Sequence, residues 1–111
     1  MGYTNYWNQT TDFTDKEWDM VRKEFKYIRE IAGDKIKVED DSSNVIAFNG
    51  GVEGNCETFI LFKHAKKKAD YEGQDIGFRF CKTRAMTYDI YVWHLLTVCT
   101  VIKKGFTINR D

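Results

Sequence analysis

The stretch Cys81–Arg84 (CKTR) places two cations and a hydroxyl group side by side, and a tyrosine and an aspartate follow closely. The sequence predicts a turn here, between a strand and a helix. Backbone N–H groups and the dipole at a helix N-terminus favour negative charge, which Lys82 and Arg84 would reinforce. We therefore expect a site for a small anionic or nucleotide-like ligand. Its candidate ligand-binding residues are Lys82, Thr83, Arg84, Tyr88 and Asp89.

The same turn also has a purely structural interpretation. Thr87 would cap the helix, Asp89 would complement the helix dipole, and the two cations would be solvated. No GxxxxGK spacing is present in the sequence, so a phosphate-binding loop of that type is not predicted. The sequence leaves both interpretations open.

A second candidate site lies in the glycine-rich segment FNGGVEGNCETF, residues 48–59. Glycines let a backbone approach a ligand closely, and polar side chains nearby can then bind it. The candidate ligand-binding residues in this segment are Asn49, Gly50 and Glu57. The alternative is an ordinary loop between strands, with Glu57 facing solvent.

His64 belongs to a basic run, KHAKKK, residues 63–68. This run either forms a solvated face or extends a binding site towards phosphates, with His64 as a further ligand-binding residue. Asp70 and Glu72 dilute its positive charge, and the whole chain has zero net charge. A protein without a positive field is not expected to bind nucleic acid sequence-specifically.

Catalysis would need a nucleophile and a base. Cys81 lies beside two cations, which can lower the pKa of a thiol, and His64 or His94 would be its base. His94, however, lies among apolar residues of a predicted helix, where a core or interface histidine is the usual identity. No hydrolase motif is present, so we expect a binding protein without catalytic residues. Three cysteines without CxxC spacing and two histidines also predict no metal site, and no cofactor is expected.

The composition is that of a folded domain. The chain has 111 residues, the size of a single domain, and 42% of them are hydrophobic. Its start is polar, and its longest apolar run, residues 90–102, is shorter than the roughly 20 residues that span a bilayer. We expect a soluble cytoplasmic protein with reduced cysteines.

The clearest local signal is FTDKEW, residues 13–18. Thr14 and Glu17 have the spacing of a capping box, and the flanking Phe13 and Trp18 that of a hydrophobic staple. Apolar residues then recur every three or four positions, and a glycine follows Ala32. The pattern predicts an amphipathic helix over residues 15–32.

Alternating and apolar patterns predict strands in the rest of the chain. The expected strands are residues 3–7, 35–40, 44–49, 56–63, 77–82 and 106–109. The segment 56–63 has apolar residues on both faces and is expected to be central. With a second helix over 88–104, the order β-α-β-β-β-β-α-β predicts an α+β fold. It would contain a mainly antiparallel sheet of five to six strands and two helices.

The predicted second helix is apolar nearly all round, which is typical of a buried helix. One side would pack on the sheet, while Ile90, Trp93, Val98 and Val101 would need other cover. The first helix or a second subunit would provide it. We expect a homo-oligomer formed through this helix.

The opening MGYTNYW, the central FNG with ETF, and FCKT followed by YD together resemble a family of small bacteriophage proteins of unassigned function. These motifs are spread over most of the chain. The resemblance implies a virus-encoded protein that acts in the cytoplasm of an infected bacterium, and it supplies no catalytic residue.

In that context the sequence favours an anti-defence protein, an oligomeric sponge that sequesters a nucleotide-derived host immune signal. Aromatic residues make up 15% of the chain, and their rings can stack on bases. A protein-binding inhibitor of a host factor and a small hydrolase that degrades such a signal are the alternatives.

Overall fold

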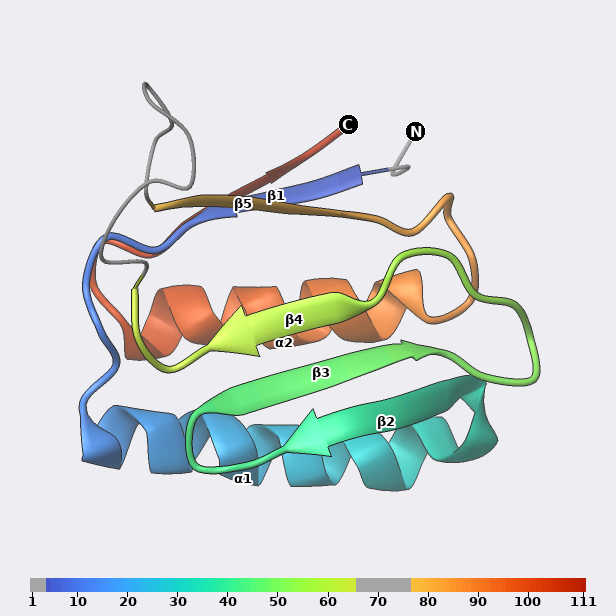
Figure 1. The fold of residues 1–111 in the computed structure, drawn as a ribbon, viewed down its shortest axis with the longest axis horizontal. Coiled ribbons are helices and arrows are strands. Elements are labelled where there is room, and N and C mark those ends of the chain that lie inside the picture. The colour runs from blue at the N-terminus through green and yellow to red at the C-terminus, as the bar shows by residue number, and fades with distance from the viewer. Residues whose placement is uncertain (1–3, 66–76) are drawn as a thin grey trace.

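The computed structural model describes residues 4–65 and 77–111, which form six strands and two long helices (Figure 1). The order and bounds are β1 (Thr4–Asn8), α1 (Asp15–Ala32), β2 (Ile36–Asp41), β3 (Val45–Gly50), β4 (Phe59–Phe62), β5 (Phe78–Lys82), α2 (Asp89–Ile102) and β6 (Thr107–Arg110). This confirms the predicted α+β fold and its order of elements. The second half of the basic run, residues 66–68, lies outside the described residues, as do the acidic residues at positions 70 and 72.

The strands form two antiparallel sheets of three strands each, in the orders β5-β1-β6 and β2-β3-β4. The predicted central position of residues 56–63 was wrong, because β4 is an edge strand in the hydrogen-bond order. Its apolar residues alternate between environments: Phe59 and Leu61 are fully buried, whereas Ile60 is 39% exposed. β5 pairs with β1 instead of β4, and this pairing divides the strands into two sheets.

The local signals at the start of α1 act as predicted. The Thr14 hydroxyl accepts a hydrogen bond from the Glu17 backbone N–H at 3.1 Å, and the Glu17 carboxylate accepts one from the Thr14 N–H at 2.8 Å. The rings of Phe13 and Trp18 lie 5.6 Å apart. α1 ends at Ala32, where Gly33 adopts a positive φ of 55° that favours glycine.

α2 begins one residue later than predicted, and it ends two residues earlier. Its N-cap is Tyr88, whose side chain makes no capping hydrogen bond, so the cap by Thr87 in the structural interpretation of the turn was wrong. Its inner face is buried at Tyr91, Val92, Leu95, Leu96 and Cys99, while Ile90 is 61% exposed and Val101 is 83% exposed. No helix in the described part of the chain is long and apolar enough to cross a membrane.

Figure 1 shows both helices behind the sheet β2-β3-β4, with the sheet β5-β1-β6 along the other flank of α2. A single cluster of buried side chains joins the layers, and Trp7 of β1 contacts Phe59 of β4 within it, with 5.1 Å between ring centroids. α2 is therefore covered by α1 and by parts of both sheets. This explains why its sequence is apolar on more than one side.

Candidate functional site

Two of the predicted ligand-binding residues, Thr83 and Asp89, are buried and bonded to each other. The Thr83 hydroxyl donates to Asp89 Oδ1 at 2.6 Å, and Asn5 Nδ2 donates to the same oxygen at 2.7 Å. Arg110 binds the other carboxylate oxygen. These contacts join β1, the turn after β5, α2 and β6. They show Asp89 as the centre of a structural network.

Arg110 completes this network on its outer side. Its guanidinium carbon lies 4.5 Å from the ring centroid of Trp93, a cation–π geometry. Two buried atoms of this network, Asn5 Oδ1 and Arg110 Nε, have no hydrogen-bond partner. Because the partners of Asp89 are mostly internal, removing its carboxylate would leave several buried donors unsatisfied.

Glu57, Lys82 and Tyr88 meet where the two sheets approach each other. The Lys82 backbone N–H donates to the Glu57 carboxylate at 2.8 Å, and the Glu57 N–H donates to the Lys82 carbonyl at 3.1 Å. The Tyr88 hydroxyl donates to the Glu57 carbonyl at 2.6 Å. Burial raises the pKa of Tyr88, so this phenol stays neutral and holds the two segments together.

The two cations of the turn are exposed. Lys82 ends β5, and Arg84 follows in a tight turn where Arg84 and Ala85 have positive φ values of 54° and 57°. Consecutive residues other than glycine in this left-handed region carry strain, which the surrounding contacts must offset. Lys82 and Arg84 therefore lie at the surface. The buried Thr83 lies between them and holds the turn through its hydrogen bond to Asp89.

Asn49 and Gly50 shape the loop between β3 and β4. Asn49 Oδ1 accepts from the backbone N–H groups of Gly50 and Cys56 at 2.7 and 3.2 Å, and its Nδ2 donates to the Cys56 carbonyl at 3.0 Å. A Cβ on Gly50 would overlap the carbonyl oxygen of Gly54. The close approach that Gly50 permits is thus between two parts of the loop itself.

His64 lies apart from the other predicted site residues. It follows the end of β4 that is remote from Glu57 (Figure 1), and its Nδ1 lies 3.0 Å from a carboxylate oxygen of Asp12. The activated Cys81 thiol considered from the sequence is also not supported. Cys81 is 1% exposed, and burial raises its pKa to about 12, which disfavours the nucleophilic thiolate.

The structure reveals a feature that the sequence analysis missed, an aromatic surface on the sheet β5-β1-β6. Tyr6 lies opposite Phe80, and Asn8 lies opposite Phe78, so these side chains share the face that points away from the core. Phe78 is 43% exposed and Phe80 is 52% exposed. The Tyr6 and Phe78 rings are stacked at 5.9 Å, and those of Phe78 and Phe80 lie 6.3 Å apart.

Polar groups and a cavity border these rings. Lys82 points to the same side as Phe78 and Phe80, because it occupies the next alternate position of β5. Asn109 of β6 lies opposite Tyr6. A cavity of about 420 Å³ is lined by Tyr6, Trp7, Asn8, Phe78, Thr107, Ile108 and Asn109. We call Tyr6, Phe78, Phe80, Asn8, Asn109 and Lys82 the outer aromatic face.

The signal for this face was present in the segment GFRFCK. Residues 78, 80 and 82 alternate with residues 79 and 81, so a buried Cys81 forces both phenylalanines outward. An exposed strand face usually carries polar residues, and two aromatic residues there are unusual. The alternating pattern predicts a strand in this segment but does not identify which of its two sides faces the core.

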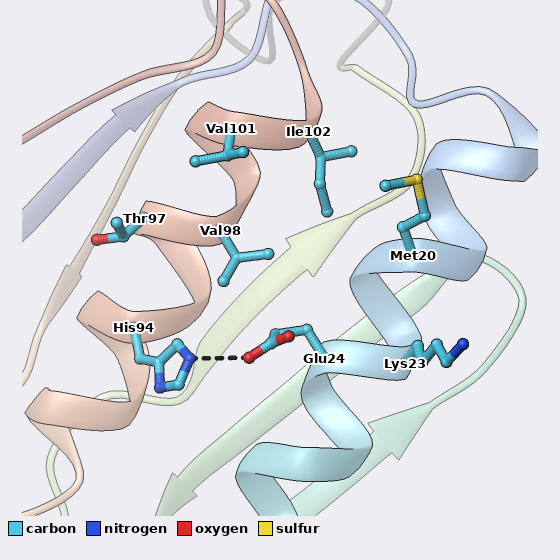
Figure 2. Close-up of a pocket in the computed structure, with 8 residues that line it drawn as sticks. All are labelled: Met20, Lys23, Glu24, His94, Thr97, Val98, Val101 and Ile102. Atoms are coloured by element: carbon cyan, nitrogen blue, oxygen red, sulfur yellow. Dashed lines mark hydrogen bonds and ion pairs between the residues drawn. The ribbon is translucent and has the colours of Figure 1, made fainter.

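A second cavity, of about 730 Å³, lies between the two helices (Figure 2). Figure 2 shows His94 of α2 facing Glu24 of α1, with His94 Nε2 3.0 Å from the glutamate oxygen. The remaining lining residues are Met20, Lys23, Thr97, Val98, Val101 and Ile102. We call these eight residues the helix groove. His94 is thus paired with Glu24 at the surface. It lies on the side of α2 that was predicted to need cover from the first helix or a second subunit.

The described residues contain three free thiols, and no group of three or more His, Cys, Asp or Glu side chains among them could hold a metal ion. No family of known proteins, no curated protein and no solved structure matches the chain. The assignment of a function therefore depends on the geometry of the outer aromatic face and the helix groove.

Proposed function

We propose that the protein binds a nucleotide-like ligand at the outer aromatic face. The observation that carries this proposal is a row of three aromatic rings, from two neighbouring strands, on one sheet face: Phe78 and Phe80 are exposed, and the half-buried Tyr6 stacks on Phe78. Planar bases stack on exposed aromatic side chains with a gain of about 1–3 kcal/mol per base. Exposed rings that touch one another, beside a cavity, are typical of a binding surface.

The direction of β5 supplies a place for the phosphate. The strand leads from Phe78 and Phe80 to Lys82, and the exposed Arg84 follows in the turn. A charge-assisted hydrogen bond from such a cation to a phosphate contributes about 1.5–3 kcal/mol. The anion site predicted from the sequence thereby becomes one end of a longer site, with the base on the rings and the phosphate at the cations.

Amide side chains complete the proposed recognition. Asn109 is exposed and lines the cavity beside the rings, and its amide can both donate to and accept from the edge of a base. Asn8 lines the same cavity, but its Oδ1 is buried, which leaves its amide nitrogen as the group for recognition. The outer aromatic face offers rings, amides and a lysine, without a nucleophile held by a base. We therefore propose that the protein sequesters its ligand, in keeping with a phage-encoded sponge for a nucleotide-derived signal.

Titration calorimetry with the four common ribonucleoside monophosphates tests this proposal. Phe80→Ala should weaken binding by about tenfold or more, because one stacking partner is lost. Lys82→Ala should weaken it by a similar factor. Val101→Ala is the matched control, since it removes an exposed apolar side chain from α2. The proposal is wrong if no nucleotide, mononucleotide or dinucleotide, binds at millimolar concentration, or if Phe80→Ala binds like the parent protein.

The helix groove favours a second candidate function, the binding of a protein surface. Val101 is 83% exposed and Met20 is 48% exposed, and both lie beside the cavity between the helices. Burying such side chains against a partner is favourable, at about 25 cal/mol per Å² of apolar surface. A second copy of the chain is the partner that the sequence analysis predicts, and a host protein is the alternative.

A further inference from the structure

We infer that the ligand of the outer aromatic face carries two linked nucleotides, with one base on Phe80 and the other on Phe78. This inference rests on the proposed function and deepens it by naming the class of ligand. It depends on the spacing of the rings, the position of Tyr6 and the distribution of charge around the face.

The spacing of the two phenylalanines fits two bases. Phe78 and Phe80 occupy successive outward positions of β5, which are about 6.6 Å apart along a strand. Their ring centroids are 6.3 Å apart, and their ring planes differ by 35°. One planar base cannot lie flat on two rings that are tilted to this extent. Two bases can each lie parallel to one of the rings, provided that the bases are not stacked on each other.

Tyr6 supports the second base position. Its ring stacks on Phe78, with planes only 26° apart, and its hydroxyl donates to the Asp111 carboxylate at 3.2 Å. This hydrogen bond restrains the tyrosine ring before any ligand arrives, which lowers the entropy cost of binding. In sheets that bind single-stranded RNA, aromatic residues on adjacent strands stack two or three bases. The outer aromatic face has that arrangement on β5 and β1.

The charges limit the length of the ligand. Lys82 and Arg84 provide cations at one end of the ring row, where the phosphate that follows the base on Phe80 would lie. The chain as a whole has 17 basic and 17 acidic residues, and so no general positive field. A long nucleic acid draws its affinity from many phosphate contacts. A short ligand with two bases and few phosphates suits these charges better.

A series of ligands tests the inference by calorimetry at one salt concentration. The series contains a monophosphate, a linear dinucleotide, a cyclic dinucleotide and a single-stranded decamer of the same base. At least one dinucleotide should bind about tenfold or more tightly than the monophosphate, because a second base stacks. Phe78→Ala should remove most of this gain and change monophosphate affinity by less than about threefold. Ile60→Ala, which trims an exposed side chain of β4, should leave both affinities unchanged.

The outcomes separate the inference from the proposed function. If the monophosphate binds as tightly as the tighter-binding of the two dinucleotides, the inference is wrong and the proposed function stands. If nothing in the series binds, both are wrong. A decamer that binds far more tightly than the dinucleotides, with a steep salt dependence, would mean that the ligand is a nucleic acid strand, and would overturn the inference. A preference for the cyclic or for the linear dinucleotide supports the inference and identifies which of these two classes of dinucleotide is the ligand.

Discussion

The ring of Tyr6 stacks on the ring of Phe78 at 5.9 Å on the face of β1 and β5 that points away from the core. The residue next to Tyr6 in the chain, Trp7, is 3% exposed and packs on Phe59 in the interior. The side chains of these two adjacent aromatic residues thus lie on opposite faces of the sheet. The inner ring stabilises the fold, and the outer ring is left for contacts with other molecules.

This division predicts unequal effects of two phenylalanine substitutions on stability. Phe59→Ala should lower the free energy of unfolding by about 3–5 kcal/mol, because Phe59 is fully buried. Phe80→Ala should change it by less than about 0.5 kcal/mol, because that ring is half-exposed. Urea unfolding of both variants measures the difference. A loss of several kcal/mol in Phe80→Ala would mean that the outer rings belong to the scaffold.

Asp89 should contribute to stability far more than a helix-dipole residue does. Asp89→Ala leaves Asn5, Thr83 and Arg110 without their shared acceptor, so we expect a loss of about 3 kcal/mol. A charge that only complements the dipole would contribute about 0.3–1 kcal/mol. Asp19→Ala, at an exposed position of α1, is the control for urea unfolding. A loss in Asp89→Ala no larger than in the control would contradict the structural role.

Two buried thiols predict a fall in stability at alkaline pH. Burial raises the pKa of Cys81 to about 12 from an ordinary 9.0, and burial also raises the pKa of Cys99. Below pH 9 both thiols are protonated in the folded and unfolded states, so they contribute no pH dependence. Above pH 9 the unfolded chain loses these protons first, and the free energy of unfolding falls. The slope is at most about 1.4 kcal/mol per pH unit for each thiol.

Urea unfolding between pH 7 and pH 10.5 measures this slope. The variant Cys99→Ala should show a shallower decline above pH 9 than the parent protein, because one of the two thiols is gone. An equal decline in both proteins would show that Cys99 is accessible to solvent and ionises in the folded state.

The proposed pairing through the helix groove predicts a dimer. Sedimentation equilibrium at micromolar concentration should give about twice the subunit mass of 13.1 kDa. Val101→Glu should restore the monomer, because it places a charge in the apolar contact. Val52→Glu, in the loop after β3 where Val52 is 73% exposed, should leave the dimer intact. A monomer at all concentrations would leave a different protein as the partner of the groove.

The elements of the fold were predictable where their signals are local. The capping box at Thr14 and Glu17 defines the start of α1 from residues only three positions apart, and the helix has the predicted bounds. The strands were predictable from alternation in the same way. The pairing of β5 with β1 was not predictable, because it joins residues 70 or more positions apart, such as Tyr6 and Phe80. The division into two sheets follows from that pairing.

The same distinction applies to the candidate site. Lys82 and Arg84 were identified from charge alone, and they are exposed. The burial of Thr83 and Asp89 was not predictable, because it depends on Asn5, 84 positions from Asp89, and on Arg110 of the last strand. Which side of β5 faces the core is likewise decided by distant partners, so the outer aromatic face required the structure.

An NMR titration shows whether a nucleotide binds to the outer rings. Addition of the dinucleotide that binds most tightly should shift the ring protons of Tyr6, Phe78 and Phe80 upfield, because a stacked base shields these protons. The backbone signals of β1, β5 and β6 and of the turn at Arg84 should shift with them, while those of the helix groove stay in place. Unchanged ring signals, or shifts confined to α1 and α2, would show that the outer aromatic face does not bind the nucleotide.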